Sequence, residues 1–452
     1  MKPAVEKLMG RRVFCRSIGV AAGAAAASLV SDADLKAVAQ NVNRNSTPSQ
    51  LKITDLRAAV VGRAPMTAPI IRIDTNQGIS GYGEVRDGAS KNYALMLKSR
   101  ILGENPCNVD RIFRKIKQFG NHGRQGGGVS AVEMACWDLA GKAYGVPVYQ
   151  MLGGKFRDKI RLYADTPEVS DGTEQGRRLK ARMDAGLTFL KVDFGINLLK
   201  GIPGTVTQPL QPAPVTWTMH PFTGIEITDK GISILSDYVA AIRQVIGMEI
   251  PLAADHFGHI GVNSCIRLAR AMEKYNLAWM EDMVPWQLTE QLKEIKDSVE
   301  VPIITGEDIY LKEGFGKLVH ANAVDLVHPD LATAGGILET KKIGDLAMDG
   351  GVAMAMHFAG TPVSFMANVH CAAATENFLV LEHHSVDVPW WQDVVAGLDK
   401  PLVRDGFVSV PEKPGLGVEP NEDVIKQHLL EPGYFAPTPE WDNERSWDRL
   451  WS

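Results

Sequence analysis

The sequence predicts an α/β fold built on a closed, parallel, eight-stranded barrel of the TIM type, and three observations predict it. Eight short apolar runs, rich in β-branched residues, each end in polar residues. From the third run onward, these polar ends lie 23 to 27 residues apart, the length of one strand plus one helix. The segments between runs, such as Cys265–Tyr275 and Leu288–Asp297, have the apolar spacing of helices. Strands that alternate with helices in this way favour a parallel barrel.

The eight runs are the expected barrel strands, and one interval breaks their rhythm. They cover Ile160–Asp165, Phe189–Phe194, Ile250–His256, Leu277–Asp282, Val301–Asp308, Ala323–Asp330, Gly351–Phe358 and Phe378–His384. Asp255 lies 62 positions after Asp193, far more than one strand and one helix need. The excess is a Pro- and Gly-rich insert over residues 197–230. A lid, an oligomer contact and a variable surface loop all remain open for it.

The segments outside the barrel have distinct characters. Residues 1–39 read as a signal peptide of the twin-arginine type, with Arg11-Arg12, a short apolar stretch and the small residues Ala37-Val38-Ala39. A disordered Ala-rich tail is the alternative. We expect a linker over 40–50, an α+β unit over 51–155, the barrel over 156–400, and a C-terminal segment over 401–452 that returns to the α+β unit. Export predicts a periplasmic protein, and a cytoplasmic location is the alternative.

Bulk composition excludes several classes of partner. The 452 residues carry 48 basic and 53 acidic side chains and a net charge of −5, which argues against nucleic acid or an anionic membrane as a partner. The apolar stretch Ile18–Val30 is too short to span a bilayer, so we expect no stable membrane insertion. None of the five cysteines forms a CxxC pair, so neither a redox nor a zinc site is expected.

Three successive expected strands end in Asp255, Glu281 and Glu307. Barrel enzymes carry their active sites at the carboxyl ends of the strands, so these side chains should converge. Three converging carboxylates repel one another unless a cation lies among them. Oxygen ligands of this kind suit Mg²⁺, and the sequence therefore predicts one Mg²⁺ per chain, held by these three residues.

The next strands offer a general base. His357 ends the seventh run and Asp330 ends the sixth, so the two should be neighbours around the barrel. A carboxylate beside an imidazole selects its tautomer, and we expect it to raise the pKa of His357. Glu382, on the eighth strand, is expected to donate or accept a hydrogen bond to the substrate. Lys191, on the second strand, is expected to neutralise a developing enolate.

Three stretches carry a family resemblance that covers nearly the whole chain after the expected signal: Val129–Lys142 (VSAVEMACWDLAGK), Pro147–Gly154 (PVYQMLGG) and Lys413–Val418 (KPGLGV). Together they resemble the enolase superfamily, mandelate racemase subgroup. The resemblance implies a modified (β/α)7β barrel with an N-terminal α+β capping domain, and often a homo-oligomer. It also implies two specificity loops in the cap, near Gly62–Ala68 and Val85–Lys91.

The same resemblance implies a chemistry. Asp255, Glu281 and Glu307 would hold Mg²⁺, which binds the carboxylate of a small substrate, while a base removes the neighbouring proton to form an enediolate. The His–Asp dyad of the subgroup falls on His357 and Asp330, and its last-strand glutamate falls on Glu382.

The sequence departs from the subgroup's pattern at Asp193. In Lys191-Val192-Asp193 this aspartate stands where the racemases carry a second lysine, so one of two opposed bases is missing. A single base suits loss of water, and the expected activity is therefore a hydro-lyase that converts an aldonate or aldarate into a 2-keto-3-deoxy acid. A second departure is Phe257, at a position where dehydratases of the subgroup often carry histidine. Its neighbours His256 and His259 are candidate acids, although strand alternation would turn His256 away from the pocket.

Two rival functions remain open. An epimerase, racemase or cycloisomerase would use the same enediolate but needs a second base, for which Asp193 or His256 is the candidate. An exported sugar-acid-binding protein that has lost catalysis belongs to another class, and the intact carboxylates and dyad argue against it.

Overall fold

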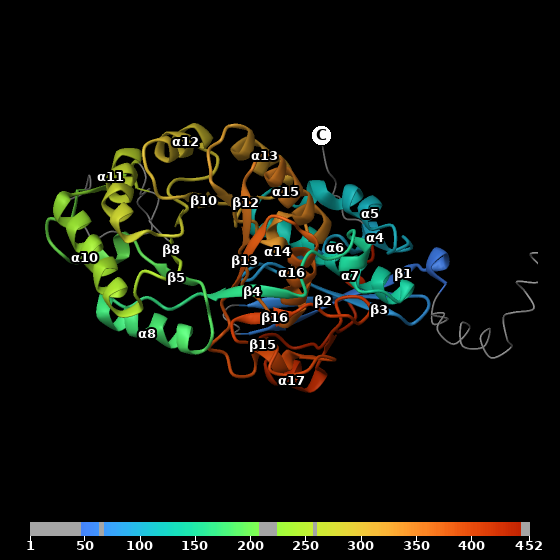
Figure 1. Ribbon diagram of the computed structural model, residues 1–452. Coiled ribbons are helices and arrows are strands. Elements are labelled where there is room, and N and C mark those ends of the chain that lie inside the picture. The colour runs from blue at the N-terminus through green and yellow to red at the C-terminus, as the bar shows by residue number, and fades with distance from the viewer. Residues whose placement is uncertain (1–46, 63–66, 208–223, 256–259, 444–452) are drawn as a thin grey trace, which may run out of the picture. The chain divides into compact units, whose positions relative to one another are not determined.

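All eight expected barrel strands are present in the computed structural model, which describes residues 47–62, 67–207, 224–255 and 260–443. The strands are β4 (Lys159–Ala164), β5 (Leu190–Asp193), β8 (Leu252–Asp255), β9 (Met280–Glu281), β10 (Ile303–Thr305), β11 (Leu326–Val327), β12 (Ala353–Met356) and β13 (Phe378–His383). They pair in parallel in the order β4-β13-β12-β11-β10-β9-β8-β5. The end strands β4 and β5 are also in contact, which closes the ring (Figure 1).

A helix follows each of the first seven barrel strands. These helices are α8 (Gly172–Asp184), α10 (Asp229–Ile246), α11 (Val262–Met272), α12 (Thr289–Asp297), α13 (Lys312–His320), α15 (Ile337–Asp349) and α16 (Pro362–Ala374), with the single turn α14 (Leu331–Ala334) ahead of α15. The eighth strand, β13, leads instead into the 3-10 turn η6 (Trp391–Val394). The predicted (β/α)7β barrel is therefore confirmed.

The capping domain combines a small sheet with helices. Its antiparallel sheet contains β1 (Ile53–Val61), β2 (Ala68–Thr75) and β3 (Ser80–Glu84), and its helices are α3 (Asn92–Leu95), α4 (Lys98–Ile101), α5 (Val109–Ile116), α6 (Gly127–Tyr144) and α7 (Val148–Met151). Gly83 allows the sheet to approach α6, because a Cβ at that position would lie 2.0 Å from the backbone oxygen of Ala131.

Helix α6 connects the capping domain to the barrel. Nearly all of its side chains are buried, as expected of a helix that is apolar on every face. The buried carboxylate of Glu133 accepts hydrogen bonds from the backbone N–H groups of Ile337 (2.7 Å) and Leu338 (3.0 Å), in the first turn of α15. A carboxylate at that position satisfies N–H groups that have no partner within the helix. The cap is thereby fixed to the barrel at one orientation.

The C-terminal segment contacts both domains. Its elements are β14 (Val395–Ala396), β15 (Val403–Arg404), β16 (Phe407–Ser409), β17 (Glu419–Pro420) and α17 (Glu422–Gln427). Strand β16 pairs antiparallel with the first barrel strand, β4. The backbone then returns to the cap, where Gly62 N–H donates to His428 (3.0 Å) and Leu430 N–H donates to Val60 (2.9 Å).

The insert after β5 begins and ends in ordered structure. Beyond the 3-10 turn η4 (Ile196–Leu199), β6 (Val206–Thr207) pairs antiparallel with β7 (Glu226–Ile227), directly ahead of α10. Residues 208–223 lie outside the described residues, as do 63–66 of the first expected cap loop, the expected signal peptide over 1–39, and His256, Phe257 and His259.

The remaining elements are short 3-10 turns: η1 (Pro48–Gln50), η2 (Lys117–Phe119), η3 (Gly123–Gly126), η5 (Glu273–Tyr275) and η7 (Pro439–Trp441). Among the described residues, no helix is both long and apolar enough to cross a lipid bilayer.

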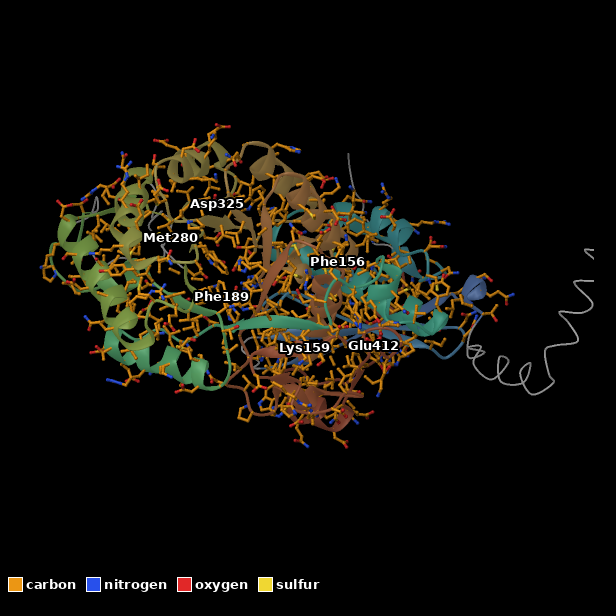
Figure 2. The ribbon with its side chains drawn as sticks, in the orientation of Figure 1. Phe156, Lys159, Phe189, Met280, Asp325 and Glu412 are labelled. Carbon is orange, nitrogen blue, oxygen red and sulfur yellow. The ribbon has the colours of Figure 1, made fainter. Side chains whose placement is uncertain are left out.

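Each barrel strand, or the residue directly before it, contributes one side chain to a buried apolar layer inside the barrel. The layer consists of Tyr163, Phe189, Ala253, Trp279, Ile304, Leu326, Ala355 and Val380. Phe189, labelled in Figure 2, comes from the position directly before β5. Because side chains alternate along a strand, the position two residues further on points to the same interior, nearer the carboxyl ends. This apolar layer is therefore the floor of the candidate site.

Candidate active site

The layer above this floor is polar. Two residues beyond the floor positions stand Asp165, Lys191, Asp255, Glu281, His328, His357 and Glu382. Each of them follows from the same alternation that buries the apolar layer. The fold thus brings together five of the predicted site residues, and Glu307 reaches the layer by a different route.

Glu307 breaks the alternation, because the position two residues beyond Ile304 is Gly306. Gly306 has a φ of +150°, a conformation that residues with a side chain rarely adopt. A Cβ there would lie 2.6 Å from the ring of Phe315 and 3.0 Å from the backbone of His328. This local turn at the end of β10 brings the Glu307 carboxylate to the site.

The predicted metal ligands lie close to one another. Single side-chain ligand atoms of Asp255, Glu281 and Asp282 lie within 4.8 Å of one another, and so do those of Glu281, Glu307 and His328. Burial raises the pKa of Glu307 to about 7; Arg86 opposes the shift, and the nearby carboxylates of Asp255 and Glu281 add to it. Bound positive charge would relieve this repulsion. Oxygen donors in this arrangement fit a divalent cation, so the carboxylate cluster is a candidate metal site. The roles of Asp255, Glu281 and Glu307 as its ligands, and Mg²⁺ as the ion, stay predictions.

Lys191 lies beside the same carboxylates. Its Nζ is 2.5 Å from Asp255 Oδ2, 2.9 Å from Glu382 Oε1 and 3.5 Å from Glu281 Oε2, and the side chain is 2% exposed. Burial alone would lower the pKa of Lys191, but these carboxylates raise it well above its usual value. Lys191 is therefore a fixed positive charge at the centre of the polar layer.

The Asp330–His357 pair forms as the sequence predicts. Nδ1 of His357 lies 2.7 Å from Oδ2 of Asp330, and its Nε2 lies 3.3 Å from Oε2 of Glu307. The other Asp330 oxygen accepts a hydrogen bond from the N–H of Thr333 (2.9 Å), at the start of α14. Asp330 therefore fixes the ring with one nitrogen turned toward the carboxylates.

Arg86, from the expected cap loop Val85–Lys91, contacts the same pair. Its guanidinium forms an ion pair with Asp330, lies 2.8 Å from Nδ1 of His357 and lies 3.3 Å from Glu307. The side chain is 1% exposed. A cation from the capping domain therefore lies between the predicted base and one of the predicted metal ligands.

The expected effect of Asp330 on the imidazole is wrong. Burial, and then the positive charge of Arg86, lower the pKa of His357 well below its usual value. Burial also raises the pKa of Asp330 to about 6, although Arg86 opposes that shift. The sequence identified Asp330 as the partner of His357, but it gave no indication that Arg86 would contact the same pair. His357 is consequently a neutral imidazole, the form that accepts a proton.

His328 was not predicted as a site residue. Its Nδ1 lies 2.6 Å from Glu281 Oε1 and its Nε2 lies 2.9 Å from the hydroxyl of Tyr163. Burial would lower the pKa of His328, but Glu281 raises it above its usual value. The signal was present in the sequence, since His328 lies two residues before Asp330 on the same strand face.

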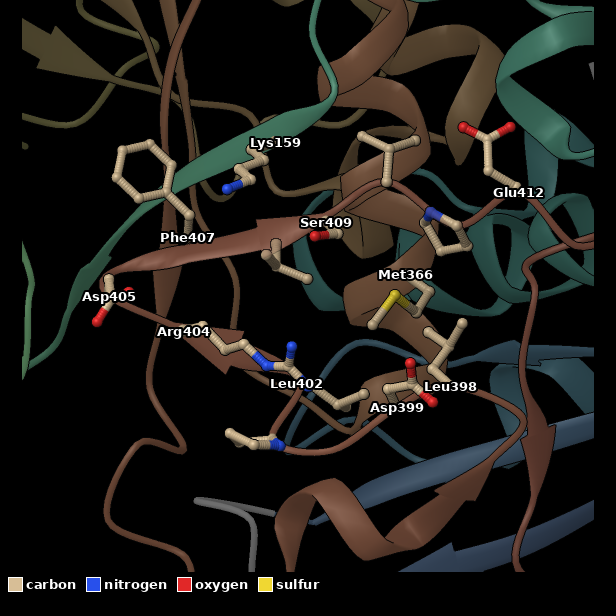
Figure 3. A pocket seen from close by; sticks show the side chains of 14 residues that line it. Lys159, Met366, Leu398, Asp399, Leu402, Arg404, Asp405, Phe407, Ser409 and Glu412 are labelled. Carbon is tan, nitrogen blue, oxygen red and sulfur yellow. The ribbon is translucent and has the colours of Figure 1, made fainter.

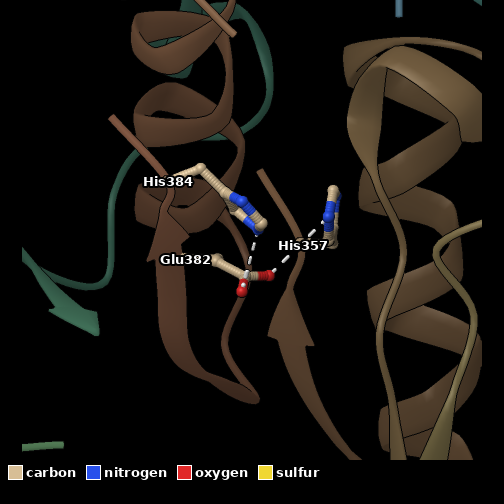
Figure 4. A group of neighbouring side chains, drawn as sticks. All are labelled: His357, Glu382 and His384. Atoms are coloured by element: carbon tan, nitrogen blue, oxygen red, sulfur yellow. Dashed lines mark ion pairs between the residues drawn. The ribbon is translucent and has the colours of Figure 1, made fainter. Parts of the chain in front are cut away.

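Glu382 is ionised and fully buried. Burial favours its neutral form, but Lys191 and His384 hold the pKa of Glu382 well below its usual value. Of the two roles expected, accepting a hydrogen bond is therefore the one that fits. Figure 4 shows the Glu382 carboxylate between the rings of His357 and His384.

Neither of the two second-base candidates has its role tested. Asp193 ends β5 directly beside Asp255, its register partner on β8, and is half-buried. Its catalytic role stays a prediction. Since His256 lies outside the described residues, its role stays a prediction as well. Trp391, in the segment that follows the last strand, is buried against Phe365, and its indole N–H donates to Gly360 (2.8 Å).

A cavity of about 420 Å³ adjoins the site between cap and barrel. The cap contributes His122 and Arg124, and the barrel loops contribute Asp282, Trp286 and Asp308. A second cavity, of about 400 Å³, lies elsewhere (Figure 3). It includes Lys159, at the amino end of β4, and is therefore at the end of the barrel opposite the polar layer.

Comparisons with known proteins agree with this architecture. Residues 33–153 match the mandelate racemase/muconate lactonizing enzyme N-terminal domain, and residues 176–424 match the enolase C-terminal domain-like family. The cap and the barrel define a two-domain enzyme class with its site at the carboxyl ends of the strands. The chain belongs to the enolase superfamily, in its mandelate racemase/muconate lactonizing enzyme subgroup.

Individual proteins of the superfamily are similar to this chain over most of its length. The chain is 33% identical to a D-xylonate dehydratase of Haloferax volcanii, over 84% of this chain and 89% of that protein. It is 28% identical to a D-galactonate dehydratase family member of Pantoea ananatis, over 88% and 98% of the two chains. A crystal structure of a mandelate racemase/muconate lactonizing enzyme-like protein from Rubrobacter xylanophilus superposes with a TM-score of 0.76 at 30% identity, over 85% and 99% of the two chains.

Proposed function

We propose that this chain is a Mg²⁺-dependent hydro-lyase that removes water from an aldonate or aldarate and releases a 2-keto-3-deoxy acid. The observation that carries the proposal is the Asp330–His357 pair at the edge of the carboxylate cluster, with the imidazole Nε2 3.3 Å from Glu307. Asp255, Glu281 and Glu307 would hold the cation, which supplies positive charge for the substrate carboxylate and for the enediolate.

The chain's own residues supply the proton transfer and much of the electrostatics. His357 is neutral and takes the α-proton, while Asp330 holds the ring so that Nε2 faces the carboxylates. Lys191 adds a permanent positive charge beside the forming enediolate. Glu382 is ionised and accepts a hydrogen bond from a substrate hydroxyl.

Two observations favour dehydration over racemisation. Asp193 occupies the position on β5 that carries the second lysine of the racemases, so the face opposite His357 lacks that base. The relatives named above are a D-xylonate dehydratase and a D-galactonate dehydratase family member, which points to sugar acids as the substrate class.

A screen of aldonates and aldarates with Mg²⁺ tests the proposal. We expect a 2-keto-3-deoxy acid from at least one member, and loss of the product by about 10³-fold or more in His357→Asn. His370→Asn is the matched control, because His370 is an equally buried histidine that stacks on Tyr149 outside the site. Exchange of the α-proton with D₂O, without a 2-keto acid from any member of the screen, would refute dehydration.

Export to the periplasm and assembly into a homo-oligomer also belong to this proposal. Cell fractionation of the native chain beside an Arg11→Lys, Arg12→Lys variant tests export, with retention of only the variant expected. Light scattering of the purified protein tests assembly, and a monomer at micromolar concentration would contradict it.

A further inference from the structure

A second aspartate–histidine pair lies beside the first. His384, just after β13, has its Nδ1 3.4 Å from Oδ2 of Asp165, which follows the neighbouring strand β4. Its Nε2 lies 3.1 Å from Oε1 of Glu382. The arrangement repeats that of Asp330 and His357, in which Nδ1 contacts an aspartate and Nε2 lies 3.8 Å from the other Glu382 oxygen. One glutamate therefore lies between two aspartate–histidine pairs.

The two rings lie in different electrostatic surroundings, although they are neighbours. His357 lies against the Arg86 cation, whereas His384 lies between the carboxylates of Asp165 and Glu382. Despite burial, these carboxylates raise the pKa of His384 to about 9. His384 therefore carries a proton at neutral pH, on a ring beside the predicted base. A proton donor next to a proton acceptor is the arrangement that general acid–base catalysis needs.

The geometry points to His384 as the acid that protonates the departing 3-hydroxyl, with Asp165 as its positioning residue. The inference rests on the proposed dehydration. His357 takes the proton from C2, and the electron pair left on C2 forms the C2–C3 double bond. The C3–O bond breaks and His384 Nε2 gives its proton to the oxygen, which leaves as water. The enol then loses its hydroxyl proton and gains one at C3, which returns both histidines to their starting states.

The distance between the rings also predicts the stereochemistry. Their centroids are 5.2 Å apart (Figure 4). A substrate carbon between the rings would need two van der Waals contacts, each of about 3.5 Å or more. The separation is too small for that, so both rings must approach the substrate from one side. The C2 proton and the C3 hydroxyl therefore leave from the same face, a syn elimination.

Three assays on His384→Asn test this role, with His383→Asn as the matched control. His383 is adjacent in sequence but faces the other way, with its ring 4.4 Å from that of Trp391. For His384→Asn we expect loss of water to fall by about 10²-fold or more, the range of general-acid catalysis. We expect exchange of the C2 proton with D₂O to stay within about threefold of wild type. Elimination of fluoride from the 3-deoxy-3-fluoro analogue, which needs no proton, should also persist. Asp165→Asn should show a smaller loss of the same pattern.

The outcomes separate this inference from the proposed function. If His384→Asn loses proton exchange and fluoride elimination together with dehydration, its role is structural and the inference is overturned. Unchanged dehydration in that variant overturns it as well, and assigns both proton transfers to His357. A wild-type protein that forms no 2-keto acid refutes the proposed function before any variant is compared, and the inference falls with it. Conversion of only the C3 epimer that reacts by anti elimination overturns the one-sided geometry.

Discussion

The guanidinium of Arg86 lies 2.8 Å from Nδ1 of His357, so a capping-domain residue contacts the pair that the barrel supplies for proton abstraction. The same guanidinium contacts Asp330 and Glu307. Completion of the site therefore depends on the correct seating of the cap, and an isolated barrel would lack the charge that, after burial, lowers the pKa of His357.

Replacement of Arg86 by Gln should lower both stability and activity. It leaves the buried Asp330 carboxylate without its cation, and loss of one partner of a buried ion pair costs about 3 kcal/mol or more. Urea denaturation measures the free energy of unfolding. Arg72→Gln is the control, since Arg72 is a partly exposed cap arginine paired with Asp74 and its replacement should cost about 1 kcal/mol or less. Equal costs for the two variants would contradict the role given to Arg86.

Neutralisation of Glu307 should have opposite effects with and without a divalent cation. In the metal-free protein, Glu307→Gln removes repulsion from Asp255 and Glu281, so its melting temperature should rise. Wild type should gain about 2.7 kcal/mol at a cation concentration 100 times the dissociation constant, and the variant should lose most of that gain. Thermal melts with EDTA and with increasing Mg²⁺ measure both effects. An equal Mg²⁺-dependent rise in both proteins would remove Glu307 from the ligand set.

Glu84 should make the protein less stable as the pH rises. Its buried carboxyl, hydrogen-bonded to the N–H of Thr361 (2.8 Å), has its pKa raised to about 8, mainly by burial. The folded protein therefore binds this proton more tightly than the unfolded chain does. The resulting stability is complete below the unfolded pKa near 4.5 and is lost as the pH rises to about 8.

Glu84→Gln removes the titration and keeps a group that can hydrogen-bond Thr361. Between pH 5 and pH 8, the free energy of unfolding should fall less in the variant than in wild type. The two falls should differ by an amount on the order of kilocalories per mole. Urea titrations at each pH measure both. Glu419→Gln is the control, because Glu419 is a more exposed carboxylate that pairs with Lys142 of the cap. Parallel stability curves for wild type and Glu84→Gln would sink the assignment.

Asp193→Asn should separate dehydration from epimerisation. If His357 is the only base, the variant keeps most of its dehydration, because Asp193 then has no proton to move. In an epimerase that uses Asp193 as its second base, the variant would lose inversion at C2, yet His357 would still exchange one epimer. Proton NMR in D₂O with each C2 epimer follows both reactions. A loss of dehydration of about 10²-fold or more would assign Asp193 a role in proton transfer.

The sequence predicted the barrel well because two features of its pattern, the length of the apolar runs and the spacing between them, have a physical cause. Apolar runs at strand length, repeated every 23 to 27 residues, leave few other ways to bury the runs. The alternation of side chains along a strand places His328 and His384 on inward faces, as it does Glu382, so these two residues were within reach of sequence reasoning. Arg86 was not, because it enters from a loop of another domain, and no periodicity reports which loop residue reaches across.

Glu307 and His357 also depend on contacts that the sequence pattern does not reveal. The run Val301–Asp308 identified Glu307, but the positive φ of Gly306 that turns it inward depends on close packing against Phe315 and His328. The lowered pKa of His357 likewise comes from burial, and then from Arg86, which arrives from another domain. Contacts between distant segments therefore determine the orientation of Glu307 and the charge state of His357, and the order of residues in the sequence does not reveal such contacts.

Because β6 and β7 pair with each other, the length of the segment between them has little effect on the stability of the barrel. The pairing joins Thr207 to Glu226, so the 18 residues between them start and finish side by side, whatever their number. The entropic cost of closing a flexible loop rises by only about 0.6 kcal/mol for each doubling of its length. Evolution, or an engineer, can therefore lengthen, shorten or exchange the segment between β6 and β7 at little cost in stability, while the barrel stays the same.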